Sequence, residues 1–317
     1  MEIYDCVIIG AGPCGIGAAL KLKEAGVNFL LINSGTPGGK INVAPRVDNY
    51  PREHEIPGPD LAVKFYQRLL DNNISIVGDT VLSLKKENDL FFVECEYGQY
   101  QAKTVLIASG TRERKIGLAK EEELLGHGIS YCSICDGHFF KGKDVAVIGG
   151  GNASLKEAIH LAAFTNKVYV IHRRNEFRGS IKLVDELRAM SNVEIITPYI
   201  PKEILGEDKV TGLVIENREN GSLRELKIDG LFPLVGQDPN TQYIKIDGVL
   251  NEWNTIPVDR NMMSSVPGLF AGGDVLPREI RQIYLAEHDG MVAAKSIAEY
   301  LKKQVLKKHF FDTLIGV

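Results

Sequence analysis

The sequence predicts an α/β protein made of two Rossmann-like, three-layer ββα domains, each of the kind that binds a dinucleotide. Three observations support this fold class. A strand, a glycine-rich turn and a helix open the chain, and a second unit of the same kind begins at Lys143. The chain also has 317 residues, which is long enough for two domains that each bury a core.

Composition narrows the class of protein. Hydrophobic residues make up 44% and charged residues 25% of the chain, as in ordinary globular proteins. The net charge of −4 argues against a nucleic-acid-binding surface, and no apolar run reaches the ~18 residues of a membrane span. We see no signal peptide, and five cysteines with only two closely spaced do not form a secreted disulfide framework. We therefore expect a cytoplasmic protein that binds neither nucleic acid nor membrane.

The first unit is expected to have a strand at residues 5–9, a helix at 18–25 with Gly26 just past its end, and a buried strand at 28–32. Its turn, residues 10–15, matches G-x-G-x-x-G. In such a turn the first glycine allows a tight bend, the second lets a pyrophosphate approach, and the third lets the helix pack on the strand. The candidate dinucleotide-binding residues of this turn are Gly10, Gly12, Pro13 and Gly15.

The end of the second strand departs from this pattern. A carboxylate normally stands there and accepts hydrogen bonds from the ribose hydroxyls. This chain has Asn33 and Ser34 instead. Because an asparagine carbonyl can accept such a bond, we expect weaker ribose binding but not loss of the nucleotide.

A loop rich in glycine and proline follows at residues 35–60, and a loop of this length is usually functional. After it we expect a helix capped by Asp60 and then four strands, at residues 60–72, 74–77, 81–85, 90–96 and 104–109. Cys6, Cys14 and Cys95 lie in or beside apolar runs, which predicts buried structural thiols.

A C-x-x-C motif, Cys132 to Cys135, precedes the second unit and is followed by Asp136. Such a motif lowers the pKa of one thiol, and a neighbouring carboxyl can exchange the protons that accompany electron transfer. The alternative is half of a zinc site, but the sequence offers no second pair of ligands to complete four. We therefore interpret Cys132, Cys135 and Asp136 as a redox-active catalytic group and expect no metal.

The second unit is expected to have a strand at residues 144–148, a helix at 155–164 and a strand at 167–171. Its turn, residues 149–154, reads G-x-G-x-x-S. A basic cluster stands where an acid would favour NAD, and arginine forks suit the 2′-phosphate of NADP. The alternative is a solvated strand end. The cluster consists of His172, Arg173, Arg174 and Arg178.

The last third of the chain is expected to begin with strands at residues 193–197, 210–216 and 224–228. A further strand leads into a glycine turn that ends in Asp274, a residue type that can bond a ribityl hydroxyl of a flavin. The next helix, at about residues 280–301, has Arg281 and Gln282 in its first turn. Its N-terminus can stabilise negative charge on a reduced flavin. For the tail, residues 302–317, disorder and packing in a dimer both stay open.

Taken in order, these motifs resemble the low-molecular-weight, bacterial-type thioredoxin reductase family of flavin-dependent disulfide oxidoreductases. The resemblance extends from Tyr4 to about Leu301, and its most specific part is the C-x-x-C-Asp motif between two nucleotide-binding units. The resemblance implies a discontinuous FAD-binding domain at residues 1–113 and 246–317. It also implies an inserted NAD(P)H-binding domain at residues 114–245, which carries the C-x-x-C motif.

The enzyme that this resemblance implies is a homodimer that passes electrons from NADPH through FAD to the dithiol and on to thioredoxin or a thioredoxin-like protein. Cys135 would lie nearer the flavin, Cys132 would attack the partner's disulfide, and Asp136 would act as acid and base. The implied FAD-binding residues are Gly10, Gly12, Pro13, Gly15, Gly38, Gly39, Lys40, Ile41, Asn49, Ala108, Gly110, Gly273, Asp274, Arg281, Gln282 and Ile283. The implied NADPH-binding residues are Gly149, Gly151, Asn152, Ser154, His172, Arg173, Arg174 and Arg178.

The chain also departs from the family's pattern. Lys40 replaces a glutamine, Cys14 and Ser154 replace alanines, Asn152 replaces an aspartate, and Lys156 replaces an acid. Two alternative functions therefore stay open. One keeps the flavin and the dithiol but takes electrons from ferredoxin or another donor. The other is a redox-sensing flavoprotein without turnover.

Overall fold

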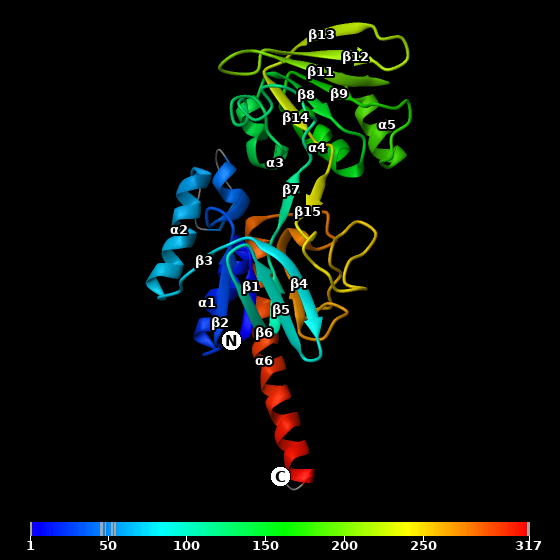
Figure 1. Ribbon diagram of the computed structural model, residues 1–317. Coiled ribbons are helices and arrows are strands. Elements are labelled where there is room, and N and C mark those ends of the chain that lie inside the picture. Colours follow the sequence, from blue (N-terminus) through cyan, green and yellow to red (C-terminus); the bar gives the residue numbers. More distant parts are fainter. Residues whose placement is uncertain (1, 45–46, 48, 52, 54, 316–317) are drawn as a thin grey trace. The chain divides into compact units, whose positions relative to one another are not determined.

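The computed structural model describes every residue except 1, 45–46, 48, 52, 54 and 316–317, and its side chains are described up to residue 306. The chain forms two compact units (Figure 1). Unit 1 comprises Met1–Val43, Tyr50–Arg112 and Asp238–Val317, and unit 2 comprises Ala44–Asn49 and Glu113–Gln237. The division assigns a short segment, Ala44–Asn49, and a long one, Glu113–Gln237, to unit 2, so the main chain crosses between the units at both ends of each segment.

Unit 1 is built on a sheet with the strand order β3-β2-β1-β6-β5-β4, in which β16 pairs with β6. The pairs β1–β2, β1–β6, β2–β3 and β6–β16 are parallel, and β4–β5 and β5–β6 are antiparallel. The strands are β1 (Ile3–Ile9), β2 (Phe29–Asn33), β3 (Val77–Gly78), β4 (Val81–Glu87), β5 (Leu90–Cys95), β6 (Gln99–Ile107) and β16 (Leu269–Ala271).

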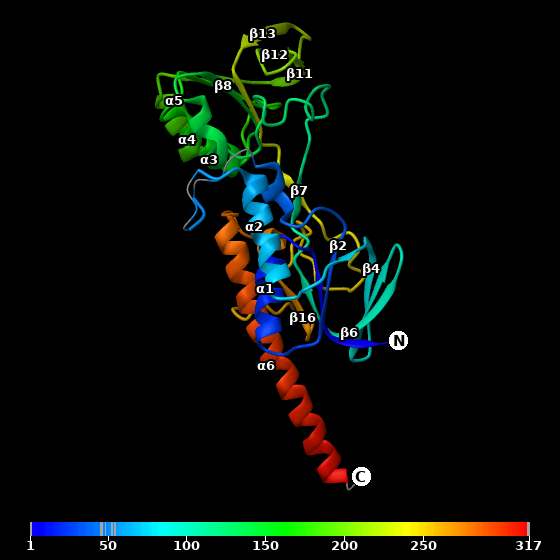
Figure 2. The ribbon, with the colours of Figure 1, turned by 90° about the vertical axis from the view of Figure 1, so that its left-hand side faces the viewer.

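The helices of unit 1 are α1 (Pro13–Glu24), α2 (Gly58–Asp71) and α6 (Ile283–Ile315), with short 3-10 helices η1 (Gly39–Val43) and η3 (Gly273–Val275). Helices α1 and α6 run side by side (Figure 2). Glycine permits this close packing, because a Cβ at Gly17 would lie 2.8 Å from the carbonyl oxygen of Glu287 on α6. The glycine turn at the start of α1 is thereby held against the start of α6.

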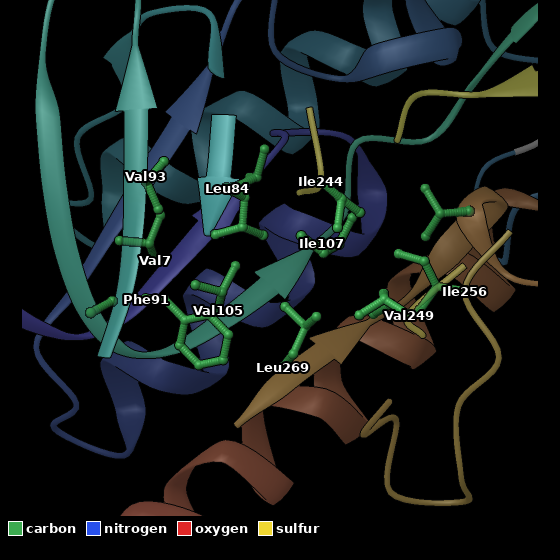
Figure 3. Close-up of a cluster of buried hydrophobic side chains, with 14 of the residues drawn as sticks. Val7, Leu84, Phe91, Val93, Val105, Ile107, Ile244, Val249, Ile256 and Leu269 are labelled. Carbon is green, nitrogen blue, oxygen red and sulfur yellow. The ribbon is translucent and has the colours of Figure 1, made fainter. Parts of the chain in front are cut away.

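The hydrophobic core of unit 1 lies between this sheet and residues 244–256, which belong to the last segment of unit 1. Val7, Val105 and Ile107 of β1 and β6 belong to the same buried cluster as Ile244 and Ile256 of that segment (Figure 3). Because side chains alternate along a strand, Ile8 and Leu106 point to the opposite face, and both are also fully buried. Burial on both faces explains why these parallel strands read as continuous apolar runs in the sequence.

Unit 2 has three layers, which confirms the ββα fold class. A parallel sheet of order β10-β9-β8-β14 forms the middle, and an antiparallel sheet of order β11-β12-β13 forms one outer layer. Helices α4 and α5 form the other. The elements are β8 (Asp144–Ile148), α4 (Asn152–Ala162), β9 (Lys167–Ile171), α5 (Ile181–Ala189), β10 (Val193–Ile196), β11 (Tyr199–Leu205), β12 (Gly212–Asn217), β13 (Leu223–Lys227) and β14 (Gly230–Pro233).

The side-chain alternation of β8 shows how the layers of unit 2 are joined. Val145 and Val147 pack with Leu155 and Leu161 of α4, whereas Ala146 and Ile148 pack on the face where the antiparallel sheet lies. Four shorter elements remain, two of which, β7 and β15, each contain residues of both units. These are β7 (Thr111–Glu113), α3 (Ser133–Asp136), η2 (Gly137–Phe140) and β15 (Gln237–Pro239), of which β7 and β15 pair with each other.

Several element boundaries differ from the sequence prediction. Helix α1 begins at Pro13 rather than at residue 18, because proline fits the first helical position, where its missing N–H would have no partner in any case. Asp60 is not the N-cap of α2, which is Pro57; Asp60 lies in the first turn. Only Val77 of the expected strand at residues 74–77 pairs with β2. Helix α6 continues to Ile315, so the tail is helical from residue 302 to residue 315.

Among the described residues, no helix is both long enough and apolar enough to span a bilayer.

Candidate functional site

The two cysteines of the C-x-x-C motif form a disulfide. Cys132 is the N-cap of α3, and the peptide N–H of Cys135 donates a hydrogen bond to Cys132 Sγ at 3.2 Å. Both cysteines are half-buried, so the disulfide is partly open to solvent. A closed disulfide fits the redox interpretation and not half of a zinc site. The other cysteines, Cys6, Cys14 and Cys95, are buried free thiols as predicted.

Asp136 is buried beside this disulfide, where it receives a hydrogen bond from a residue that the sequence reasoning missed. Ser130 Oγ donates to Asp136 Oδ2 at 2.5 Å and accepts the peptide N–H of Cys132 at 3.1 Å. Ser130 is itself buried. One hydroxyl therefore fixes both the carboxyl and the backbone at the first cysteine. The only sequence signal for it was a serine two positions before Cys132.

A second carboxyl also contacts the disulfide loop. Glu157, in the second turn of α4, accepts the peptide N–H of Ser133 through Oε2 at 2.9 Å. Burial is the largest cause that raises the pKa of Glu157; its hydrogen bonds with Ser133 lower it, and the nearby Glu113 raises it. The contact joins residues 24 positions apart in the sequence. No local pattern could have indicated it.

The residue directly before the motif is anchored by a third carboxyl. Tyr131 donates from its hydroxyl to Glu121 Oε1 at 2.7 Å, and Glu121 also accepts the peptide N–H groups of Ile116 and Gly117. Glu121 is only 2% exposed. Burial and this acceptor raise the pKa of Tyr131, so the phenol stays protonated. The loop before Cys132 is thus tied to the segment that enters unit 2.

The first glycine turn has the shape that a dinucleotide needs. Gly10 has φ +107°, and a Cβ there would lie 2.5 Å from the carbonyl oxygen of Ala108. A Cβ at Gly12 would meet nothing within 4 Å, so the backbone there is open to an incoming group. Asn33 Oδ1 accepts the peptide N–H of Ala11 at 2.9 Å. Asn33, which stands where a ribose-binding carboxylate is usual, therefore stabilises the glycine turn through this hydrogen bond.

Residues from three predicted FAD-binding segments come together in unit 1. Lys40 Nζ donates to Thr111 Oγ1 at 2.7 Å and lies 3.8 Å from Asp274 Oδ2. The turn that bears Asp274 is held by Asp289 of α6, which accepts the peptide N–H of Gly273 at 2.9 Å and pairs with Arg278 at 2.9 Å. Asp289 is almost fully buried. Sequence reasoning missed it because it lies inside a helix, far from any motif.

Most of the remaining predicted FAD-binding residues belong to the same segments of unit 1. The peptide N–H of Gly38 donates to the carbonyl of Ala11, which brings the second glycine pair to the first turn. Ile41 and Ala108 are buried, and Gly110 accepts the peptide N–H of Asn240. Arg281 and Gln282 were expected in the first turn of the last helix, but α6 begins at Ile283, so they directly precede it. Asn49 lies in the short segment assigned to unit 2.

The second glycine turn, in unit 2, is stabilised by its own serine. Ser154 Oγ accepts the peptide N–H of Gly151 at 3.0 Å and is 2.9 Å from its carbonyl oxygen, so Ser154 faces into the turn and is buried. Asn152 is exposed at the start of α4, and its Oδ1 accepts the peptide N–H of Ser180. A Cβ at Gly151 would meet nothing within 4 Å, as at Gly12 in the first turn.

The basic cluster is brought to this turn by backbone hydrogen bonds. The peptide N–H groups of Arg178 and Gly179 both donate to the carbonyl of Gly150 at 3.0 Å. Arg173, Arg174 and Arg178 are exposed, as residues that bind a phosphate must be. Their position beside an open helix N-terminus fits a pyridine nucleotide with a 2′-phosphate.

His172 differs from its three arginine neighbours. Its ring is buried, stacks on Phe177 with centroids 4.9 Å apart, and lies where a Cβ of Gly150 would be. Burial is the largest cause that lowers the pKa of His172; a hydrogen bond with the Glu176 backbone raises it, and the three arginines lower it further, so at neutral pH the ring is neutral. Among the described residues its Nε2 has no hydrogen-bond partner. The structure therefore places His172 behind the turn, where it supports the backbone.

Comparison with known proteins identifies the family. The sequence profile described as pyridine nucleotide-disulphide oxidoreductase matches residues 4–290. The chain belongs to this family. Membership of this family accounts for the two glycine turns, which suit nucleotides, and for the Cys132–Cys135 disulfide.

Three relatives within the pyridine nucleotide-disulphide oxidoreductases narrow the similarity. A thioredoxin reductase of Mycoplasma pneumoniae is 37% identical over 94% of this chain and 96% of its own length. The crystal structure of thioredoxin reductase from Streptococcus pyogenes is 38% identical, with a TM-score of 0.89 over 95% of this chain and 99% of the other. A ferredoxin-flavin thioredoxin reductase from Clostridium acetobutylicum is 30% identical, with a TM-score of 0.53 over 96% of this chain and 100% of the other.

Proposed function

We propose that this chain is an FAD-dependent thioredoxin-disulfide reductase, in which electrons from NADPH reach the Cys132–Cys135 disulfide and then the disulfide of thioredoxin. The activity follows from thioredoxin reductases that match almost the whole chain, and thioredoxin is therefore the protein substrate. The observation that carries the proposal is the disulfide closed beside a buried carboxyl, Asp136, in a chain of this family.

The exchange with thioredoxin can be written on residues of this chain. Once reduced, Cys132 attacks one sulfur of the substrate disulfide as a thiolate, which forms a mixed disulfide and releases the other substrate sulfur. Cys135 loses its proton and attacks Cys132, which re-forms the Cys132–Cys135 bond and releases the substrate as a dithiol. Two electrons and two protons pass to the substrate. Asp136, hydrogen-bonded to Ser130, is placed to accept and return a proton.

We assign the cofactors to separate units. FAD would be held in unit 1 by the first glycine turn and the segments that bear Lys40 and Asp274, and NADPH in unit 2 by the second glycine turn and the three exposed arginines. When bound, FAD accepts two electrons from the nicotinamide and supplies them to a disulfide. The open backbone at Gly12 and at Gly151 supports both assignments, since a pyrophosphate needs close approach to a glycine turn.

The proposal extends to assembly and location. We propose a cytoplasmic homodimer, on the ground of the family resemblance and of a C-x-x-C chemistry suited to a reducing compartment. The net charge of −4 supports a protein substrate rather than a nucleic acid.

Anaerobic titration of the FAD-loaded protein with NADPH tests the proposal. Loss of the oxidised flavin absorbance, followed by its return when oxidised thioredoxin is added, is the expected result. Flavin reduction without thioredoxin turnover would contradict the reductase and support a redox-sensing flavoprotein. The control uses Cys132→Ser protein, in which NADPH should still reduce the flavin but thioredoxin should not reoxidise it.

One observation favours a second donor. The chain resembles a ferredoxin-flavin thioredoxin reductase over almost its whole length. If NADPH and NADH both failed to reduce the flavin and reduced ferredoxin succeeded, the disulfide chemistry would stand and the NADPH assignment would fall.

A further inference from the structure

We propose that Glu157 is a positioning residue that sets the reactivity of the Cys132 thiol, because it holds the peptide N–H of Ser133 and thereby places a carboxyl beside the disulfide loop. The proposal deepens the proposed function and rests on it for the role of Cys132. Glu157 lies outside the C-x-x-C-Asp motif and outside both glycine turns.

Three peptide N–H groups of the disulfide loop donate to three different acceptors. The N–H of Cys132 goes to Ser130 Oγ, the N–H of Ser133 to Glu157 Oε2, and the N–H of Cys135 to Cys132 Sγ. Peptide N–H groups that point at a sulfur stabilise its thiolate. Glu157 holds the N–H of the residue that directly follows Cys132, so its carboxyl lies next to the backbone that carries this sulfur.

The charge of Glu157 also acts on the Cys132 thiol. Glu157 is partly buried, and a carboxylate close to a thiol disfavours the thiolate by like-charge repulsion. The same repulsion acts on Glu157, whose pKa burial already raises. Two groups that interact in this way titrate together, so the protonation of Glu157 should favour the thiolate and the ionisation of Glu157 should oppose it.

The other charged groups around Glu157 do not replace it in this role. Glu113 of β7 acts on it through space, and Asp136 of α3 is held by Ser130. On α4 itself, Lys156 and His160 are exposed, as is His138 of η2. The charged residues of the neighbouring helix α5 are also exposed; they are Lys182, Asp185, Glu186 and Arg188.

The structure also explains why a glutamate at this position reaches the loop. Helix α4 begins at the second glycine turn, and its next turn packs against α3, which carries the disulfide. Glu157 therefore stands on the same helix as the nucleotide-binding turn and within unit 2, so the contact with Ser133 needs no other part of the chain.

The test measures the alkylation of Cys132 in FAD-loaded Cys135→Ser protein, in which Cys132 is a free thiol. The rate of reaction with iodoacetamide is recorded against pH by mass spectrometry of the Cys132 peptide. Two proteins are compared: the Cys135→Ser parent, and the same protein with the additional substitution Glu157→Gln. Glutamine keeps the length of the side chain and can still accept the N–H of Ser133, so only the charge is lost. At a pH below the thiol pKa we expect alkylation to become about tenfold faster, as for a thiol pKa lowered by about one unit.

Glu225→Gln on β13 is the matched control, because Glu225 is an exposed carboxylate of the same unit, and its profile should equal that of the parent. Glu157→Asp should restore at least part of the parent profile, since it restores the charge. Superimposable profiles for the parent and Glu157→Gln would overturn the proposal. The proposal would also be overturned if the pH profile of the parent were described by the ionisation of the thiol alone. This second measurement does not depend on the folding of any Glu157 variant.

This experiment separates the proposal from the proposed function. Alkylation requires neither NADPH nor thioredoxin, so a protein that failed to reduce thioredoxin could still show the shift. Conversely, if the protein reduced thioredoxin and Glu157→Gln left the alkylation rate unchanged, the proposed function would be supported and the role of Glu157 would be refuted.

Discussion

At the scale of single residues, the disulfide loop is held mainly by side chains outside the C-x-x-C motif. Ser130 bridges Asp136 and the backbone of Cys132, Glu157 binds the N–H of Ser133, and Glu121 anchors Tyr131. Each is a hydroxyl or a carboxyl that accepts a hydrogen bond from the loop. A buried donor left without a partner costs about 1–3 kcal/mol, so these side chains restrict the loop to one conformation.

The two cysteines provide the first prediction. Cys132→Ser and Cys135→Ser should each abolish thioredoxin reduction, because no disulfide can form, and should leave FAD bound, because neither residue lies in a glycine turn. The measurement is the flavin content of the purified variants together with thioredoxin reduction. A variant that lost its flavin would show instead that the disulfide holds the fold together.

The arginines provide the second prediction. Arg173→Ala with Arg174→Ala should raise the KM for NADPH and leave the KM for NADH nearly unchanged. Hydrogen bonds to a charged group are worth about 1.5–3 kcal/mol each, so the rise should be at least about tenfold. Arg188→Ala, an exposed arginine on α5, serves as the control and should change neither value. Equal use of NADPH and NADH by the unaltered protein would refute the assignment.

At the scale of elements, each glycine turn depends on a side chain that supports it. In unit 1 the Asn33 carbonyl fastens the turn at Ala11, and in unit 2 the ring of His172 packs on Gly150. Both residues directly follow or end the second strand of their unit, where the family pattern places ribose or phosphate ligands. The same position can thus support the turn in place of binding the nucleotide.

His172 leads to a third prediction, on pH and stability. Its pKa is lowered from 6.5 in the folded protein, so the unfolded chain binds the proton more tightly than the folded chain does. Unit 2 should therefore lose stability as the pH falls below about 6.5 and through the lowered pKa. Denaturant unfolding between about pH 5 and pH 8 measures this effect.

Two histidine variants sharpen that measurement. In His172→Gln the part of the pH dependence that belongs to this ring should disappear. In His160→Gln, where the lost ring is exposed on α4, the dependence should remain. If both variants kept the same pH dependence as the parent, protonation of His172 would not be its cause.

Sequence reasoning reached the motifs and the strands that are buried on both faces, because period and glycine spacing are local signals. It found β8 and β9 with their observed bounds. It placed the start of α4 late because a glycine turn hides the first helical turn, and it did not find α5 or β11, whose patterns are weakly apolar. Ser130, Glu157 and Asp289 were missed because their roles arise from contacts that only the folded chain makes.

At the scale of the whole molecule, the division into two units predicts two separable responses to ligands. Unit 1 has its own core around the sheet of β1 and β6, and unit 2 has its own cores on the two faces of its parallel sheet. A ligand that binds one folded unit stabilises that unit, by about 2.7 kcal/mol at a hundred times its Kd.

Scanning calorimetry of the FAD-loaded protein tests this fourth prediction. Two transitions are expected, of which NADP⁺ should raise only one, and the double arginine variant should lose that rise while both transitions remain. NAD⁺ at the same concentration is the control and should shift neither by much. A single transition that moved as a whole would mean that the units unfold together.

The two ends of Glu113–Gln237, the longer segment of unit 2, lie next to each other. The peptide N–H of Arg114 donates to the carbonyl of Gly236, the Gln237 side chain donates to Glu113, and β7 pairs with β15. A segment whose beginning and end meet can be cut out of a gene and replaced as one cassette, since a short linker would close the gap that it leaves. Exchanging residues 114–236 between relatives should therefore give recombinant chains whose FAD-binding half still folds. Donor and substrate preferences could then be inherited independently of the flavin site.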